Sequence, residues 1–160
     1  AAVLIGLIAH DDGPHVVLTE RTAHLKRHAA EISFPGGRVE PEDDGPEAAA
    51  LREASEEIGL DPARVEVLGC LPPYRTVTDF CVCPVVGWIE PPVRFVPDVD
   101  EVADVFEVPL RFILDPANRQ VESIFWRGED RSYHVLPYRG RRIWGATAGM
   151  LVMLANILSA

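Results

Sequence analysis

The stretch Leu51–Leu60, LREASEEIGL, places three glutamates close together in the chain. If it is helical, Glu56 and Glu57 follow Glu53 by three and four residues, so the carboxylates share one side of two turns. Like charges at these spacings repel each other by about 0.2–0.5 kcal/mol per pair on an exposed helix. On these residues alone, a solvated helix face is the common explanation and a bound cation is the alternative.

Signals at both ends predict a helix from about Pro46 to Ile58. Proline suits the first turn of a helix, and Gly59 stands directly after the last predicted residue, where glycine commonly ends helices. We expect the three carboxylates to face outward, opposite a side that anchors the helix. On a helical wheel that anchoring side consists of Ala48, Leu51, Ser55 and Ile58.

The segment before this helix adds further oxygen ligands. The sequence FPGG, residues 34–37, forms a tight turn that glycine permits, so its backbone can approach a ligand or offer a carbonyl oxygen. An acidic loop, residues 40–45, then leads into the helix. Several hard oxygen ligands thus fall within one short unit, which is what Mg²⁺ or Mn²⁺ requires. This neighbourhood favours a metal site as the reason for the crowded glutamates.

The rest of the chain combines strand-like runs with a second long helix. The runs are rich in β-branched or aromatic residues and are bounded by Gly, Pro or Asp. We predict a helix over about 143–158, where apolar residues repeat as on a helix packed against a sheet, and a short helical turn over 109–114. The predicted strands are Ala2–Ala9, His15–Glu20, Arg64–Leu71, Phe80–Ile89, Val121–Trp126 and Ser132–Leu136.

Size and composition suit one compact domain covering residues 1–160. The chain is 48% hydrophobic, and a domain of this length buries about 70% of the surface that it exposes when unfolded. The net charge of −10 argues against nucleic acid or a membrane surface as partner, because both require a large basic face. No apolar run approaches the roughly 18 residues of a membrane-spanning helix. The opening AAVLIGLIA lacks a basic start, which is typical of a core strand rather than of a signal peptide.

The cysteines are Cys70, Cys81 and Cys83. An odd number, with no second pair near the Cys-x-Cys spacing, argues against a disulfide framework or a structural zinc site. Strand alternation puts Cys81 and Cys83 on one face, where we expect small buried residues. Such cysteine usage fits a reducing compartment, and we expect the protein to be cytoplasmic.

The segment Gly37–Leu60 resembles the Nudix box, in which a glycine and an acidic residue precede Arg-Glu-hydrophobic-x-Glu-Glu-x-Gly-hydrophobic. Residues 52–60 match this last pattern in full. The front half is one residue longer than usual, and either Asp43 or Asp44 stands for its single acidic residue. The resemblance implies a Nudix fold of the α/β class, with a mixed β-sheet sandwiched between α-helices.

The same resemblance implies a Nudix hydrolase and assigns roles within the box. The expected ligands of Mg²⁺ or Mn²⁺ are the carbonyl of Gly37 and the carboxylates of Glu53, Glu56 and Glu57. Arg52 is expected to orient the glutamates through an ion pair, so Arg52 and the three glutamates form the expected catalytic set. A metal here would neutralise a substrate diphosphate, polarise phosphorus and lower the pKa of a bound water. The base for that water stays open between Glu53 and two loop acids, Glu101 and Glu107.

Upstream, Val17–Gly37 resembles the signature of the coenzyme A pyrophosphatase branch of the family. Leu18, Thr19, Arg21 and the FPGG turn match this signature. The departures are mostly conservative in charge or size, although one replaces a glycine, and they are Val17, Thr22, Lys26 and Ala30. Two later segments, 71–89 and 143–148, also resemble this branch, with Asp79 where its members often have glycine. The implied reaction is hydrolysis of coenzyme A, or of a derivative, to 4′-phosphopantetheine and adenosine 3′,5′-bisphosphate.

The segment 17–37 is also the most basic part of this acidic chain. We expect Arg21, Lys26 and Arg27 to bind the ribose 3′-phosphate of coenzyme A through charge-assisted hydrogen bonds, with Phe34 and Gly36 completing the substrate-binding residues. A solvated loop whose cations balance nearby acids is the alternative. The whole cluster lies within eight residues and comprises Arg21, His24, Lys26, Arg27 and His28.

Two other functions stay open. In the first, the substrate is another nucleoside diphosphate derivative, such as ADP-ribose or NADH. In the second, the chain is a Nudix-fold module that binds nucleotide without turnover. In every case the partner is a small-molecule nucleotide, and the chain is compatible with a homo-oligomer. We interpret His10, His15 and His134 as strand-end residues without a special role.

Overall fold

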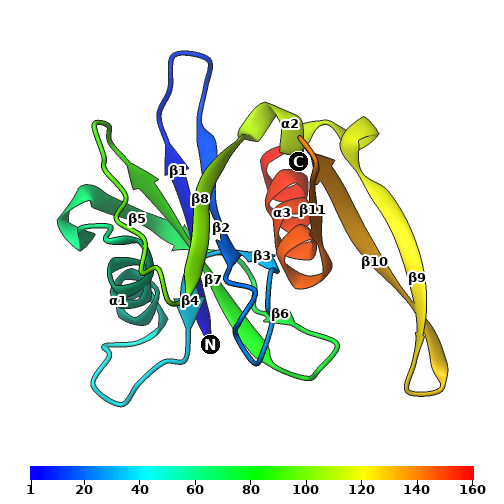
Figure 1. The fold of residues 1–160 in the computed structure, drawn as a ribbon. Helices are drawn as coiled ribbons and strands as arrows, with labels where there is room; N and C mark the ends of the chain where they lie inside the picture. Colours follow the sequence, from blue (N-terminus) through cyan, green and yellow to red (C-terminus); the bar gives the residue numbers. More distant parts are fainter.

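The computed structural model covers residues 1–160 and is built from strands and three α-helices (Figure 1). The helices are α1 (Pro46–Ile58), α2 (Leu110–Leu114) and α3 (Gly145–Leu158), with short 3-10 turns at Pro62–Arg64 and Pro116–Asn118. The strands are β1 (Ala2–Ile8), β2 (His15–Arg21), β3 (Ile32–Ser33), β4 (Gly36–Gly37), β5 (Val65–Cys70), β6 (Tyr74–Arg75), β7 (Cys81–Ile89), β8 (Val102–Pro109), β9 (Gln120–Trp126), β10 (Glu129–Tyr138) and β11 (Arg141–Trp144).

The centre of the larger sheet is the parallel pair β1 and β7. Their pairing extends along all of β1, from Ala2 opposite Cys83 to Ile8 opposite Ile89. The neighbouring pairs are antiparallel, namely β2 with β1, β8 with β2, and β5 with β7. The sheet is therefore mixed, as the sequence predicted. Strands β9–β11 form a separate antiparallel sheet.

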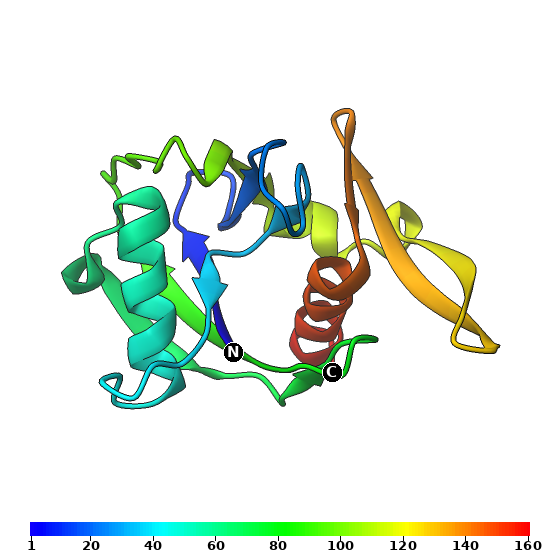
Figure 2. The same cartoon turned by 60° about the horizontal axis from the view of Figure 1, so that its bottom comes forward.

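Side chains of β1 alternate between two cores on opposite faces of the larger sheet. Leu4 shares one core cluster with Ala54 of α1. Ile5, the next residue, shares a larger cluster with Leu151 of α3. Helices α1 and α3 thus cover opposite faces, and the β9–β11 sheet lies beyond α3 (Figures 1 and 2). The predicted sandwich of a mixed sheet between helices is confirmed.

Helix α1 has the predicted bounds, but its buried side differs from the predicted one. Ser55, expected on the anchoring side, is exposed, whereas Glu57 is only 7% exposed. Small side chains on the buried side allow α1 to lie close to β1 and β4, and this brings Glu57 inside. The prediction that all three carboxylates face outward was therefore wrong for Glu57. The buried residues of α1 are Ala49, Ala50, Ala54, Glu57 and Ile58.

The last helix begins later than predicted. Ile143 and Trp144 belong to β11 and pair with Leu136 and Val135 of β10. Gly145 has a φ of 66°, a left-handed conformation that glycine adopts readily, so the strand ends there and α3 starts. None of the helices combines the length and the apolar character that a membrane crossing requires.

The cysteines are less buried than predicted. Cys81 is exposed and Cys83 is half-buried, and both thiols, like that of the exposed Cys70, are free. Alternation does put Cys81 and Cys83 on one face of β7, the same face as the fully buried Val85. The prediction that these cysteines are buried was therefore wrong at the start of β7.

Candidate metal and diphosphate site

The residues that the sequence predicted to bind a metal come together where β4 meets α1. Strand β4 consists of Gly36 and Gly37 and pairs with the start of β1. The backbone N–H of Gly36 donates to Oε2 of Glu57 at 3.1 Å. A side chain at position 37 would place its Cβ 2.5 Å from Oε1 of Glu53, so only glycine permits this approach. The glycine turn and the two glutamates therefore form one close-fitting unit.

Glu53 and Glu57 are carboxylates withdrawn from water. Desolvation is the main reason why the pKa of Glu57 is raised to about 8, although the N–H of Gly36 acts against it. Desolvation also raises the pKa of Glu53. Withdrawing neighbouring like charges from water is unfavourable unless a cation compensates. The site thus fits a divalent cation that prefers hard oxygen ligands.

Arg52 joins the acidic loop to the glutamates. Its Nε and Nη2 donate to Oδ1 and Oδ2 of Asp43 at 2.9 and 3.0 Å, which is a two-pronged ion pair. Its Nη1 lies 3.3 Å from carboxylate oxygens of both Glu53 and Glu56. Asp43 in turn raises the pKa of Arg52 above its usual value. The guanidinium therefore contacts Asp43, Glu53 and Glu56 at once, and its orienting role stays a prediction.

The structure separates the two aspartates that the sequence left open. Asp43 receives the two hydrogen bonds from Arg52 and a third, at 2.8 Å, from the backbone N–H of Glu40. The Arg52 bonds are the largest cause of the lowered pKa of Asp43. Asp44 is exposed. Asp43 is thus the acid that pairs with the box arginine.

Glu56 lies at the rim of the same site. Its side chain is 59% exposed and pairs with Arg52 at 3.3 Å. Glu53 and Glu57 are less exposed, so the three carboxylates extend from the surface into the protein. Together with the carbonyl of Gly37, they are the groups that would hold the cation.

The predicted basic cluster is divided in space. Arg21, the last residue of β2, is half-buried, and its charge lowers the pKa of Glu57, so it lies near the carboxylates. Its Nε is buried without a hydrogen-bond partner, which leaves a donor for a ligand. Lys26 and Arg27 are exposed on the loop between β2 and β3. Arg21 is therefore the member of the cluster nearest to the metal site.

The FPGG turn contributes in two ways. Gly36 holds Glu57 through its N–H, as described above. Phe34 is only 4% exposed and belongs to the larger core cluster. The structure therefore gives Phe34 a packing role beneath the turn rather than the substrate contact expected from the sequence.

Of the two loop acids considered as general base, Glu101 is the one near the carboxylates. Its negative charge raises the pKa of both Glu53 and Glu57. The N–H of Thr22 donates to its carbonyl at 3.0 Å, which ties Glu101 to the end of β2. Glu107 lies toward the opposite end of β2, among histidines. The candidates that remain are Glu53 and Glu101.

Sequence reasoning missed the backbone groups that complete this site. The N–H of Gly36 holds Glu57, and the carbonyl of Arg38 accepts a hydrogen bond from Nη2 of Arg52 at 3.1 Å. A glycine pair before the box signals a close backbone approach. The direction of these groups, however, depends on the pairing of β4 with β1, which no local pattern predicts.

A cavity of about 1000 Å³ lies elsewhere, between α3, β6 and the β9–β10 hairpin. Its lining includes Tyr74, Trp126, Trp144 and Met153, and none of the residues predicted to bind metal or substrate. The polar groups suited to a metal and a diphosphate are on α1 and β4, so we place the chemistry there.

Comparisons with known proteins identify the family of this chain. Residues 1–126 match the family described as the NUDIX domain. The "Uncharacterized Nudix hydrolase NudL" of Escherichia coli K12 is 42% identical over 155 residues, which cover 97% of this chain and 80% of that protein. A Nudix hydrolase from M. smegmatis, RenU, has a TM-score of 0.58 at 23% identity, covering 69% of this chain and 70% of its own. An Ap4A hydrolase of C. elegans has a TM-score of 0.58 at 19% identity, covering 69% and 80%. These two structures show the shared fold.

A mixed sheet between helices, with a carboxylate cluster beside a glycine turn, is typical of hydrolases that use a divalent metal on small nucleotide-derived substrates. The chain belongs to the Nudix family and is a Nudix hydrolase.

Proposed function

We propose that the protein hydrolyses the diphosphate of coenzyme A, or of a coenzyme A derivative, with Mg²⁺ or Mn²⁺ as cofactor. The products are 4′-phosphopantetheine and adenosine 3′,5′-bisphosphate. The observation that carries the proposal is the desolvated pair Glu53 and Glu57, held at the Gly36–Gly37 turn with Arg21 nearby. The resemblance of residues 17–37 to the coenzyme A branch supports the choice of substrate.

The chain's own residues prepare the site for an anionic substrate. Glu53, Glu56 and Glu57 hold the cation, which neutralises the diphosphate and activates a water when bound. Arg52 is anchored by Asp43 and holds Glu53 and Glu56 in place through its hydrogen bonds to their carboxylates. The N–H of Gly36 fixes one oxygen of Glu57. Because these contacts exist before substrate arrives, little rearrangement accompanies binding.

We assign the proton-accepting role to Glu101 or Glu53. Glu101 lies outside the box, near both buried carboxylates, at the end of a loop tied to Thr22. A carboxylate there takes the proton of the attacking water, and attack at one phosphorus expels the other phosphate. Replacing Glu101 by Gln distinguishes the two, because turnover then falls steeply only if Glu101 is the base.

We assign recognition of the substrate to the basic residues of segment 17–37, which bind two different phosphate groups. Arg21 has a buried guanidinium donor without a protein partner and lies near the carboxylates, so we assign it to the diphosphate. Lys26 and Arg27 are exposed on the neighbouring loop, so they are available to the more distant 3′-phosphate.

The experiment that tests the function is a product-resolved screen of diphosphate substrates with Mg²⁺ and with Mn²⁺. We expect coenzyme A to be cut faster than dephospho-coenzyme A, ADP-ribose and NADH, with adenosine 3′,5′-bisphosphate as the nucleotide product. Preferential turnover of ADP-ribose or NADH would reject the substrate assignment. Binding of nucleotide without turnover of any substrate would identify a silent Nudix-fold module instead.

We also propose a cytoplasmic location. The support is the set of three free thiols, two of them exposed, since such thiols persist in reducing compartments. A homo-oligomer stays a prediction.

A further inference from the structure

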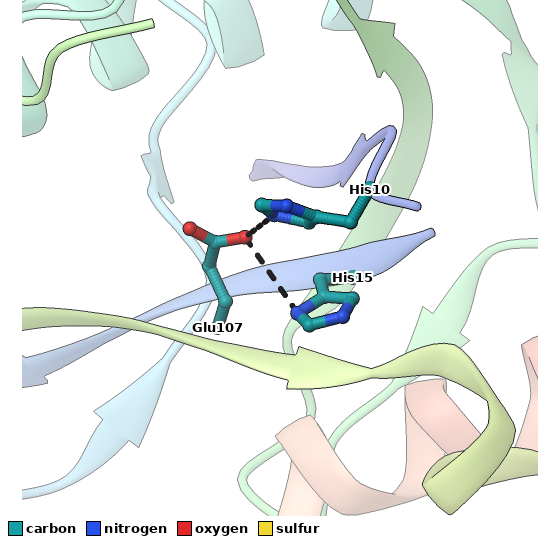
Figure 3. A group of neighbouring side chains, drawn as sticks. All are labelled: His10, His15 and Glu107. Carbon is teal, nitrogen blue, oxygen red and sulfur yellow. Dashed lines mark hydrogen bonds and ion pairs between the residues drawn. The ribbon is translucent and has the colours of Figure 1, made fainter. Parts of the chain in front are cut away.

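Two histidines and a glutamate from three neighbouring segments meet at the end of the large sheet opposite to the Nudix box (Figure 3). His10 follows β1, and His15 is the first residue of β2. Glu107 lies on β8, which pairs with β2 so that Val17 is opposite Glu107. The cluster thus joins the β1–β2 turn to a strand distant in sequence.

The ring nitrogens of both histidines face one carboxylate oxygen. Nε2 of His10 lies 2.6 Å and Nδ1 of His15 lies 3.8 Å from Oε1 of Glu107. The potential ligand atoms of the three residues all lie within 4.8 Å of one another. Ligand atoms around a tetrahedral Zn²⁺ are separated by about 3.3 Å, given metal–ligand distances of about 2.0–2.2 Å. The observed separations bracket this value, so small side-chain movements suffice.

Asp12 orients one of the two imidazoles. Its Oδ1 lies 2.9 Å from Nε2 of His15, and Arg111 pairs with the same carboxylate. A carboxylate only accepts hydrogen bonds, so Nε2–H of His15 is the donor in this contact. Nδ1 of His15, the other ring nitrogen, is the one that faces Glu107. Metal-binding histidines are commonly held by a carboxylate in this way.

We propose that His10, His15 and Glu107 form a second metal site that binds Zn²⁺ through Nε2, Nδ1 and a carboxylate oxygen. Two imidazoles and one carboxylate are a ligand set suited to Zn²⁺ and poorly suited to Mg²⁺, which prefers oxygen ligands. The side chains are partly exposed, 38% for His10 and 19% for His15, so water completes the coordination. The interpretation of these histidines as strand-end residues without a role is thereby replaced.

This site is separate from the Nudix box. Gly37 pairs with Ala2 at one end of β1, whereas His10 follows the other end. Seven residues of β1 at about 3.3 Å per residue place the two sites about 20 Å apart. The ion at the second site therefore ties the β1–β2 turn to β8 and takes no part in the hydrolysis.

The test is a titration of metal-free protein with Zn²⁺ against a chromophoric chelator, with Mg²⁺ in excess to occupy the box carboxylates. We expect one Zn²⁺ per chain that Mg²⁺ does not displace. The double variant H10A/H15A and the isosteric E107Q should each weaken this binding by about tenfold or more. The matched double variant H24A/H28A, which removes two exposed imidazoles from the β2–β3 loop, should bind Zn²⁺ like the wild type.

Two further measurements keep the outcome clear if a variant folds poorly. D12N leaves every ligand in place but removes the charge that orients His15, and should weaken Zn²⁺ binding by about 10–100-fold. Co²⁺ in place of Zn²⁺ should give visible absorption bands that are lost in E107Q. Equal Zn²⁺ binding by the wild type and H10A/H15A, or equal loss in H24A/H28A, would overturn the proposal and leave a plain His10–Glu107 ion pair.

Discussion

The carboxylate site on α1 and the basic loop between β2 and β3 are held in different ways. Glu57 is buried and fixed by Gly36, and Arg52 forms a two-pronged ion pair with Asp43. Lys26 and Arg27 are exposed. A site fixed by internal contacts has its geometry before the substrate binds, whereas an exposed loop contributes through charge that solvent and salt weaken. Changes in the first should therefore cost far more than changes in the second.

The largest effect is expected at the glutamates of the box. Replacing Glu56 or Glu57 by Gln keeps the size and the helix propensity but removes a cation ligand. We expect hydrolysis to fall by at least about 100-fold while the fold is retained. S55A, on an exposed position of the same helix, is the control and should be nearly as active as the wild type. Near-normal turnover by both glutamine variants at limiting metal would remove their metal role.

The second effect concerns stability in the absence of metal. The pKa of Glu57 is about 8 in the folded protein, against 4.5 as its ordinary value, so the folded state binds more protons between these values. Its stability then falls as pH rises from about 4.5 to 8. In EDTA, E57Q should be more stable than the wild type at pH 8 by about 3–5 kcal/mol, since one pKa unit is 1.36 kcal/mol. Urea unfolding of the wild type and E57Q at pH 4.5 and at pH 8, the two ends of this range, measures the difference. A difference in unfolding free energy that does not change with pH would contradict the prediction.

The third effect distinguishes the two aspartates of the acidic loop. D43N removes the charge that anchors Arg52, and outer partners of metal ligands commonly contribute about 10–100-fold to activity. D44N changes an exposed neighbour of the same chemistry and should leave kcat/KM unchanged. The ratio of the two variants is the measurement. Equal losses would mean that loop charge matters and that the Arg52–Asp43 pair does not.

The smallest effect is expected in the basic loop. Neutralising either Lys26 or Arg27 to Gln should lower kcat/KM for coenzyme A by about tenfold, the loss of one charge-assisted bond worth about 1.5 kcal/mol. Dephospho-coenzyme A lacks the 3′-phosphate, so its turnover should barely change. The effect on coenzyme A should shrink at high salt, because exposed charges are screened over about 8–10 Å. Equal losses on both substrates would assign the loop to the shared diphosphate.

The same contrast explains what could be predicted from the sequence. The bounds of α1 follow from Pro46 and Gly59, and the box residues follow from a long fixed pattern. The burial of Glu57 could not be predicted, because it depends on β4 packing against a helix face of small alanines. Which aspartate, Asp43 or Asp44, pairs with Arg52 likewise depends on the position of the Arg52 guanidinium in the folded protein. The contact between His10 and Glu107 depends on the pairing of β2 with β8.

Two departures from the family pattern did carry a structural signal. Ala30 and Asp79 stand where members of the coenzyme A branch have, or often have, glycine. In the structure these residues have φ values of 59° and 71°, in the left-handed region, which costs a residue such as alanine about 1–2 kcal/mol and which aspartate adopts more readily. A missing glycine at a fixed position thus indicates backbone strain as much as a change of function.

The proposed hydrolysis depends above all on a cation held by the carboxylates of α1. Electron paramagnetic resonance of free Mn²⁺ measures binding to wild-type protein, E57Q and S55A without relying on any substrate. We predict tight Mn²⁺ binding by the wild type and S55A, and a loss of affinity of at least about tenfold, or 1.4 kcal/mol, in E57Q. Equal Mn²⁺ affinity of E57Q and the wild type would contradict the account.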